Sequence, residues 1–383
     1  MSVYLDYNAS APIDNRVLDY MVQLYKGVPG NPDSRTHNFG DNARKIVEEA
    51  RQKIASLLSI DKTEVFFTSG ATESNNIALM GLREYANITG KKHIITTSIE
   101  HKAILETAKK LQSDGFIVDF IKPDISGRVK FEDVKKLLRD DTLIVSVMHV
   151  NNETGIIQPV KEIGDYLNEK GILFHIDATQ SFGKLVDELR VMKYDMLSIG
   201  AHKIGGPQGI GALILKKKRY KLPPVKSIMY GGEQEHGLRP GTLPVALIGA
   251  FGKACEIALE GYKENYQKCL GIKNEILKLL DVSGVVYHIN GNQEYGVANT
   301  LNICFRGVSS EALMLSTKQY CGVSNGSACN THSYKPSFVL TAMGVPLDDI
   351  ESSIRISWGP DTDIEDLRCS FTKLLEVVKN LAL

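Results

Sequence analysis

The chain of 383 residues has little that would take it to a membrane or to nucleic acid. Its most apolar stretch, about Val245 to Cys255, is shorter than the roughly 20 residues that cross a bilayer. No basic segment followed by an apolar one stands near the N-terminus. The 45 lysines and arginines balance the 45 aspartates and glutamates, so no bulk charge attracts an anionic partner. We therefore expect a cytoplasmic protein without direct membrane or nucleic-acid contact.

The six cysteines show no Cys-x-x-Cys pair and no regular spacing. This argues against a zinc ribbon and a disulfide framework, so we expect free thiols and no metal site. Internal repeats and low-complexity linkers are also absent, and 33 glycines and 13 prolines are ordinary for a globular chain. A chain of this length has a prior of two to three domains with a large core.

Short β-branched runs alternate with amphipathic helices from about residue 15 to residue 256. This alternation is typical of an α/β fold in which helices cover a mainly parallel sheet. One such helix follows Asp41, with an apolar stripe that includes Ala43, Val47 and Ile54. The strands expected in this region cover residues 64–67, 94–97, 116–121, 143–148, 172–176, 196–199 and 211–215.

A change of domain is expected along the unusually long helical pattern from Val245 to about Leu280. Strands near residues 285–289 and 300–304 and a last helix, capped by Thr362, predict a smaller α+β domain beyond it. We therefore expect a large domain over residues 15–256, and a small domain formed by residues 1–14 and 257–383.

Polar and small residues follow three of the expected strands. Residues 68–75 (TSGATESN) join a strand to a helix, where free N–H groups can bind a phosphate, although such a turn alone is more often an ordinary cap. Asp177 and Lys203 each follow a strand and face the carboxyl edge of the sheet. There a lysine can form a Schiff base and a carboxylate can pair with a pyridine nitrogen, as pyridoxal 5'-phosphate (PLP) requires. A capping aspartate and a solvated lysine are the plainer alternative.

The surroundings of Lys203 decide between these readings. It lies in a glycine-rich segment, residues 198–211 (SIGAHKIGGPQGIG), where the chain resembles the cysteine desulfurases of the class V aminotransferase group. The resemblance implies the fold type I architecture of PLP enzymes. The matching blocks, in chain order, are residues 4–8, 30–32 with His37, 69–74, 100–102, 149–153, 177–180, 239–242, 326–329 and 353–355.

The resemblance implies a cofactor site. Lys203 would carry PLP, Asp177 would contact its ring nitrogen, and His101 would stack on the ring and take part in proton transfers. Thr242 would reach the phosphate of a neighbouring subunit, which implies a homodimer. The other implied cofactor ligands are Ala71, Thr72, Asn152, Gln180 and His202.

The resemblance also implies the substrate and the reaction. Arg355 would bind the carboxylate of L-cysteine, as a planar charged fork can, with Asn152 nearby. Cys329 lies in a small polar segment and would take the substrate sulfur as a persulfide, leaving L-alanine, for transfer to an acceptor protein. His332 is a candidate to tune this thiol. The other cysteines fall in helix or strand patterns and are given no chemistry.

Two departures from the family pattern bear on function. Many relatives carry serine or threonine where this chain has Gly200, so we expect weaker cofactor retention through one missing hydroxyl. The sequence ends at Leu383, before the tail with which housekeeping members dock an iron–sulfur scaffold. Iron–sulfur assembly, tRNA thiolation and DNA phosphorothioate modification all remain open as pathways. A class V aminotransferase or lyase, or a scaffold without turnover, is the alternative function.

Overall fold

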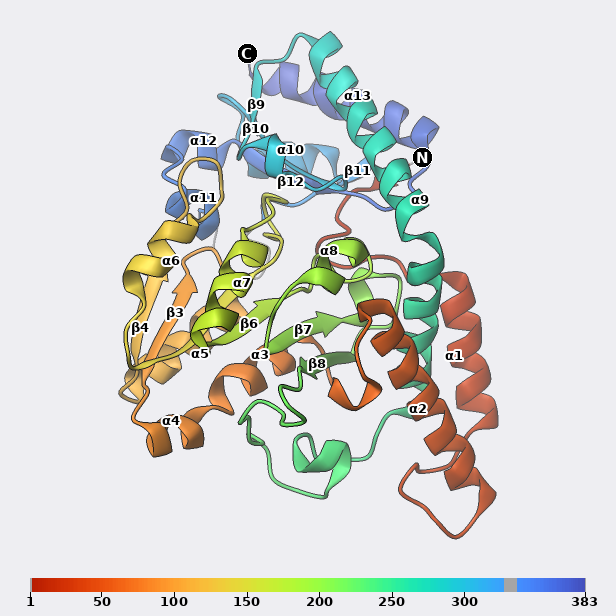
Figure 1. Ribbon diagram of the computed structural model, residues 1–383. Coiled ribbons are helices and arrows are strands. Elements are labelled where there is room, and N and C mark those ends of the chain that lie inside the picture. The colour runs from red at the N-terminus through yellow and green to blue at the C-terminus, as the bar shows by residue number, and fades with distance from the viewer. Residues whose placement is uncertain (1, 327–335, 383) are drawn as a thin grey trace.

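The computed structural model describes residues 2–326 and 336–382, and its largest element is a sheet of seven strands (Figure 1). Six of the seven strands run parallel, and β8 is antiparallel to both of its neighbours. Every strand expected in this region is present, with each end within one residue of the prediction. In spatial order the strands are β2 (Val65–Thr68), β8 (Gly211–Leu215), β7 (Met196–Gly200), β6 (Leu173–Asp177), β5 (Thr142–Met148), β3 (His93–Thr97) and β4 (Ile117–Ile121).

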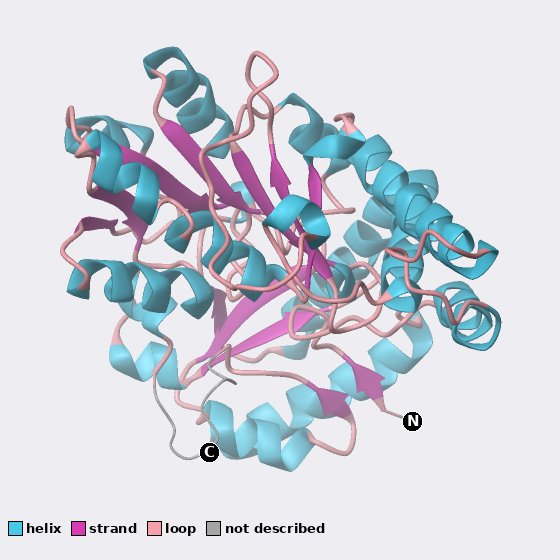
Figure 2. Ribbon diagram, turned by 90° about the horizontal axis from the view of Figure 1, so that it is seen from below, coloured by secondary structure: helices cyan, strands magenta, loops and turns pink. Residues whose placement is uncertain are grey.

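Helices cover both faces of this sheet, as Figure 2 shows from below. Side chains alternate along a strand, so the neighbours Phe66 and Phe67 of β2 enter two different apolar cores. The core on the Phe67 side includes α2 (Asn38–Leu58), α6 (Phe131–Leu137), α7 (Val160–Lys170) and α8 (Val186–Val191). The core on the Phe66 side includes α3 (Ala71–Met80), α4 (Arg83–Thr89) and α5 (Lys102–Ser113). The predicted α/β class with a mainly parallel sheet is confirmed.

A second, smaller sheet lies at the end of the molecule where both termini are found (Figure 1). It has the order β12-β10-β9, all antiparallel, and packs in a core with the last helix. Beside it, β1 runs parallel to β11. The elements of this part are β1 (Val3–Tyr4), β9 (Tyr287–Ile289), β10 (Thr300–Phe305), α10 (Ser310–Thr317), β11 (Cys321–Gly322), α11 (Phe338–Ala342), α12 (Leu347–Glu351), β12 (Ser353–Ser357) and α13 (Ile364–Leu381).

The cap of α13 differs by one residue from the prediction. The side chain of Asp363, not that of Thr362, accepts the hydrogen bond from the N–H of Asp366 at 2.8 Å. The hydroxyl of Thr362 instead accepts a hydrogen bond from the N–H of Gly359 at 3.2 Å. Both residue types are good N-caps, so the sequence alone did not separate them.

One helix links the two cores. α9 (Val245–Ser283) is 39 residues long and runs beside α1 (Asn15–Gly27) and α2 towards α13 (Figure 1). Its first part packs in the core of the large sheet and its second part, from Cys269 on, in the core of the small one. At Gly252 a Cβ atom would lie 2.6 Å from the Cα of Ala50, so glycine is what allows α9 to approach α2. The domain boundary at residue 256 stays a prediction.

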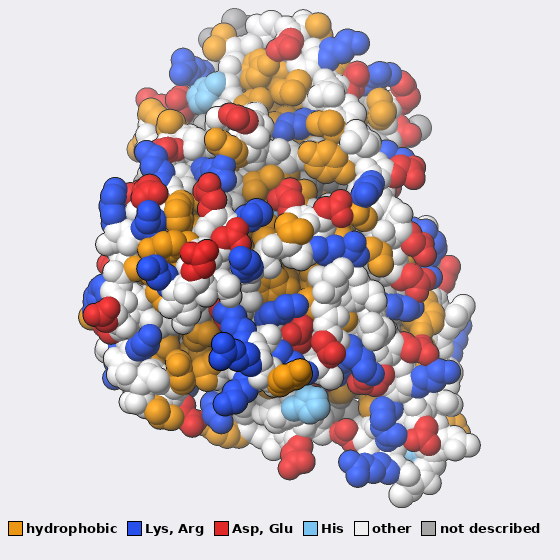
Figure 3. All heavy atoms as spheres, in the orientation of Figure 1, with side chains coloured by type: hydrophobic (Ala, Val, Ile, Leu, Met, Phe, Trp, Pro, Cys, Tyr) orange, Lys and Arg blue, Asp and Glu red, His pale blue; other side chains and the backbone are white. Residues whose placement is uncertain are grey.

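The distribution of charge over one face of the molecule (Figure 3) agrees with the equal numbers of positive and negative residues in the sequence. Positive and negative side chains are interspersed over the face drawn in Figure 3. Among the described residues, no helix combines the length and the apolar character needed to cross a membrane.

A buried ion pair fixes the segment before α9. The guanidinium of Arg51, on α2, meets both carboxylate oxygens of Glu235 at 2.7 and 2.9 Å, and the N–H of Phe67 donates to the same carboxylate at 2.7 Å. Both charged side chains are buried. Glu235 has a positive φ of 48°, a conformation that costs free energy and that these three hydrogen bonds hold in place.

We expect Glu235→Ala to lower the free energy of unfolding by about 3–5 kcal/mol, because it removes the buried carboxylate that binds Arg51 and the N–H of Phe67 and leaves Arg51 with only the more exposed Glu48, at 3.2 Å, as a counter-charge. Chemical denaturation measures this loss. Glu49→Ala is the matched control, since the exposed Glu49 on the same helix α2 pairs with Lys45 at only 3.9 Å, and we expect less than about 1 kcal/mol from it. Equal losses in the two variants would contradict the assignment.

Candidate active site

A cavity of about 960 Å³ opens at the carboxyl ends of β5, β6 and β7, the edge where open α/β sheets bind ligands. Residues predicted from distant parts of the sequence meet there. Those that line the cavity are Ala71, Thr72, His101, Asn152, Asp177, Gln180, His202, Lys203 and Arg355. The prediction that these nine side chains share one site is therefore matched by their positions, while their individual roles stay predictions.

Helix α3 begins at this cavity without a side-chain cap. Its N-cap residue is Gly70, at a positive φ of 155° that favours glycine. The N–H groups of Ala71 and Thr72 have no acceptor within the described residues. Uncapped N–H groups and the positive end of the helix dipole form a site for a phosphate group.

Gly200 lies directly beside this helix start. A Cβ atom at Gly200 would stand 3.8 Å from the backbone nitrogen of Ala71 and 3.7 Å from the His202 ring, which are ordinary contacts. The backbone of Gly200 is extended, at φ −135° and ψ 142°, and any residue can adopt it. A serine side chain would therefore fit at this position, and its hydroxyl would lie near the free N–H groups of Ala71 and Thr72.

Asp177 is the last residue of β6 and is firmly oriented. Asn75 Nδ2 donates to Asp177 Oδ2 at 2.7 Å, and the N–H and hydroxyl of Thr179 donate to Asp177 Oδ1. The carboxylate is buried, at 4% exposure. These donors fix the orientation of the carboxylate, a group that can pair with a protonated ring nitrogen. From the sequence, Asn75 is only part of the turn at residues 68–75. The hydrogen bond that it donates to Asp177 was not predicted.

Lys203 lies in the short 3-10 turn η2 (Ala201–Lys203) that follows β7. Its ammonium donates to the backbone carbonyls of Asn8 and Ala9, so it is buried without a carboxylate bound to it. Burial, followed by the positive charges of Lys184 and Arg355, lowers the pKa of Lys203 to about 7. A lysine amine with this pKa is available as a nucleophile and as a base near neutral pH.

Two histidines flank the site. Nδ1 of His101 accepts a hydrogen bond from the N–H of Ala103 at 3.1 Å and so caps α5. This assigns the proton of the neutral ring to Nε2. Burial lowers the pKa of His101, and burial together with Lys203 lowers the pKa of His202 to about 4. Both rings are therefore mainly neutral near pH 7, and the Nε2–H of His101 is available as a hydrogen-bond donor.

Arg355, on β12, joins the small sheet to the cavity. One guanidinium nitrogen contacts Asp6 at 2.6 Å and another donates to the backbone carbonyl of Asn152 at 3.1 Å. Its Nε is buried and has no partner among the described residues. The sequence analysis did not predict the ion pair between Arg355 and Asp6, although residues 4–8 were recognised as a matching block. This ion pair orients the guanidinium and leaves part of it free to bind a carboxylate.

Buried polar atoms without partners collect around this cavity. Asn8 Oδ1, Asn75 Oδ1 and Gln180 Oε1 accept no hydrogen bond from any described residue, and Arg355 Nε donates none. All four belong to residues that line the cavity. Because buried polar groups are nearly always paired, their number here indicates a polar ligand. A phosphate on α3, a ring nitrogen on Asp177 and an aldehyde carbon at Lys203 are the groups of PLP, so the residues fit this cofactor.

One predicted residue is not brought into the cavity, and two others lie outside the described residues. Thr242 is exposed and does not line it. Cys329, like His332, lies outside the described residues, so its predicted role is untested. Gly326 and Pro336, on either side of that segment, both line the cavity.

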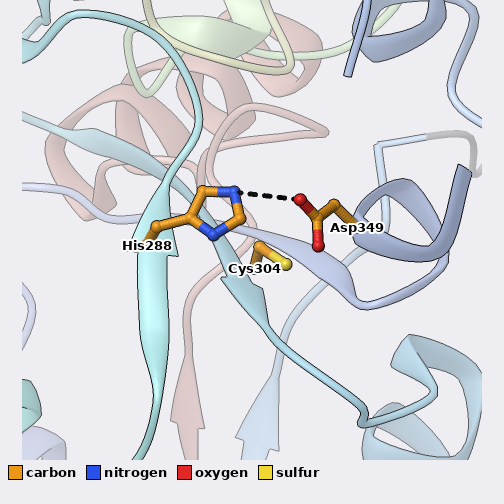
Figure 4. Close-up of side chains that lie close together, drawn as sticks. All are labelled: His288, Cys304 and Asp349. Carbon is orange, nitrogen blue, oxygen red and sulfur yellow. Dashed lines mark ion pairs between the residues drawn. The ribbon is translucent and has the colours of Figure 1, made fainter. Parts of the chain in front are cut away.

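His288, Cys304 and Asp349 form a further cluster, and none of the three lines the active-site cavity (Figure 4). They come from β9, β10 and α12, and their possible ligand atoms lie within 4.8 Å of one another. No sequence spacing reveals this cluster, because strand pairing places Cys304 opposite His288. The guanidinium of Arg306 already lies 3.7 Å from the Asp349 carboxylate, and Nδ1 of His288 lacks the supporting acceptor typical of a metal ligand. We assign it no metal chemistry.

Comparison with known proteins bears on the reaction class. Residues 3–369 match the family model for class V aminotransferases. The chain is 41% identical to the cysteine desulfurase IscS of Vibrio vulnificus strain CMCP6, over 100% of this chain and 94% of that protein.

Solved structures give the same answer. A NifS-like protein superposes with a TM-score of 0.91 at 36% identity and covers 100% of both chains. SspA in complex with cysteine superposes with a TM-score of 0.82 at 35% identity, covering 94% of this chain and 100% of its own. These neighbours confirm the predicted fold type I architecture. The chain belongs to the class V aminotransferase family and, within it, to the cysteine desulfurases, which are PLP-dependent enzymes.

Proposed function

We propose that this chain binds PLP in the 960 Å³ cavity and uses it to remove sulfur from L-cysteine, with Cys329 as the first sulfur acceptor. The observation that carries the proposal is the meeting of Lys203, Asp177 and the uncapped start of α3 in one cavity. Arg355 adds a partly free guanidinium for the substrate carboxylate. The resemblance of the chain to cysteine desulfurases along its whole length supports the same assignment.

The residues that line the cavity would have separate roles in binding and in proton transfer. When bound, PLP would supply an electron sink for the negative charge that develops at the substrate carbon. Asp177 would keep the ring nitrogen protonated, and the N–H groups of Ala71 and Thr72 would hold the phosphate. With a pKa of about 7, the Lys203 amine would accept the proton from the substrate carbon. His101 would present its Nε2–H as a hydrogen-bond donor to the bound groups, because its capping hydrogen bond occupies Nδ1.

The sulfur step belongs to Cys329. Its thiolate would attack the substrate sulfur, forming the S–S bond of a persulfide while the carbon–sulfur bond breaks. The carbon fragment takes up a proton and leaves as L-alanine, so no external oxidant or reductant is needed. The cavity lining by Gly326 and Pro336, which flank the segment carrying Cys329, supports this role.

The proposal extends to the surroundings of the enzyme. Thr242 is exposed, as a residue that serves a neighbouring subunit would be, which supports a homodimer. We further propose a cytoplasmic enzyme that passes its persulfide sulfur to an acceptor protein. Iron–sulfur assembly, tRNA thiolation and DNA phosphorothioate modification stay open as its pathway.

We expect Lys203→Ala to lower L-alanine formation from L-cysteine by at least about 10²–10⁴-fold, through loss of the proton-accepting amine. Cys329→Ser should abolish persulfide formation and sulfide release. The purified protein is assayed for both products. Lys221→Ala and Cys369→Ser, both at exposed positions, are the matched controls and should keep full activity.

The alternatives appear as distinct outcomes of that assay. Full activity in Cys329→Ser, or transfer of an amino group to a keto acid, would favour an aminotransferase or another lyase. A colourless protein that binds no PLP would favour the scaffold without turnover.

We expect Gly200→Ser to tighten PLP binding by about 10- to 100-fold, the value of one hydrogen bond to a charged phosphate. The position has room for the side chain and an ordinary backbone conformation. Titration of the apoprotein with PLP measures the dissociation constant. Gly200→Ala adds the Cβ without the hydroxyl and should leave the constant near that of the wild type. An equal gain in both variants would contradict a hydroxyl–phosphate contact.

A further inference from the structure

A second cavity, of about 380 Å³, lies against the far side of Lys203. It shares Lys203 and Gln180 with the active-site cavity and is otherwise separate from it. Its wall includes the segment before α1, the segment before α8, the middle of α9 and residues 358–361. Apolar side chains dominate that wall, among them Pro12, Ile13, Leu185, Ile204, Ile257 and Trp358. This size and character are typical of small-molecule sites.

One unpaired cation lines this apolar cavity. The ammonium of Lys184 forms no hydrogen bond and no ion pair with any of the described residues. Burial lowers the pKa of Lys184 to about 8, offset in part by the neighbouring Cys269, and no carboxylate contributes to the shift. The side chain therefore still carries its charge at pH 7. The Lys184 side chain is partly buried, and a charge in a largely apolar wall is costly unless it has a counter-ion.

The other charged groups around this cavity have hydrogen-bond or ion-pair partners, and the Lys203 ammonium donates to the backbone carbonyls of Asn8 and Ala9. Asp14 pairs with Arg16 at 2.7 Å. The hydroxyl of Tyr7 donates to Asp361 at 3.1 Å. Lys268 pairs with Glu264, outside the cavity, at 2.8 Å. Within the described part of the chain, Lys184 is thus the charged group of this wall whose ammonium has neither a hydrogen bond nor a counter-ion.

We propose that this cavity is a second ligand site, which binds a small monocarboxylate with an apolar body. The carboxylate would pair with the Lys184 ammonium, and the body would lie against the apolar wall near Ile257 and Trp358. A single unpaired cation balances a single negative charge, whereas a phosphate would bring a second charge and further acceptors into an apolar space. The occupant would lie directly behind Lys203 without entering the active-site cavity. This inference does not depend on the proposed function.

The test is a thermal-shift titration of the purified holoenzyme with sodium butyrate, hexanoate and octanoate at constant ionic strength. We expect each to raise Tm, with a dissociation constant that falls about three- to fourfold per added methylene until the cavity is full. Lys184→Met keeps an apolar stem of similar length and removes the charge, so it should weaken hexanoate binding at least tenfold. Lys268→Met is the matched control, because Lys268 lines the same cavity but is paired, and it should bind as the wild type does.

A second measurement does not depend on any variant folding. A crystal of the wild-type protein soaked with 4-bromobenzoate, a stable aryl bromide with one carboxylate and an apolar body, should show its bromine signal in the cavity lined by Lys184. Bromine beside Arg355 instead would mean that carboxylates bind the substrate site, and would overturn the proposal. It would equally be overturned by a Tm that hexanoate leaves unchanged, or by equal binding in the wild type and in Lys184→Met. None of these results involves turnover of L-cysteine, so the desulfurase assignment is judged separately.

Discussion

The pairing of β8 with two neighbours at once is the constraint on which the site depends. Antiparallel to both β7 and β2, it sets Gly211 opposite Gly200 on one side and opposite Thr68 on the other. A Cβ at Gly211 would lie 2.6 Å from the carbonyl oxygen of Ile199 and 2.7 Å from the Cα of Gly70, so only glycine allows this close approach. The start of α3 is thereby held beside the end of β7.

The parallel pairing of β6 with β7 supplies the other half of the arrangement. It places Asp177 level with Ser198, so the chain leaves both strands at the same edge, towards Thr179 in one case and Lys203 in the other. Around that edge the protein keeps an uncapped helix start and several unpaired buried atoms. Each lowers the stability of the unliganded fold. A ligand that satisfied them together would bind tightly for the same reason.

Much of this could be predicted from the sequence, because it depends on local patterns. Strand-end positions sufficed to place Asp177 and Lys203 at the carboxyl edge of the sheet, and the family resemblance supplied their expected roles. Short β-branched runs sufficed for the strands. Contacts between distant segments leave no local pattern in the sequence, because they depend on tertiary packing. Examples are the ion pair of Asp6 with Arg355 and the hydrogen bond of Asn75 with Asp177. The same holds for the cluster around His288 and for Lys184, which reads in the sequence as an ordinary charged residue.

The charges around Lys203 connect the two cavities. After burial, Lys184 and then Arg355 lower the pKa of Lys203, whereas Asp6 and Asp177 raise it. The effects of Arg355 and Asp6 on the pKa of Lys203 oppose each other, and these two residues form an ion pair. Asp177 accepts hydrogen bonds from its own donors, among them Asn75. Lys184 is the member of this set with no partner of its own among the described residues. An anion beside it would cancel part of its field and raise the pKa of Lys203, which makes the space behind the lysine relevant to the chemistry in front of it.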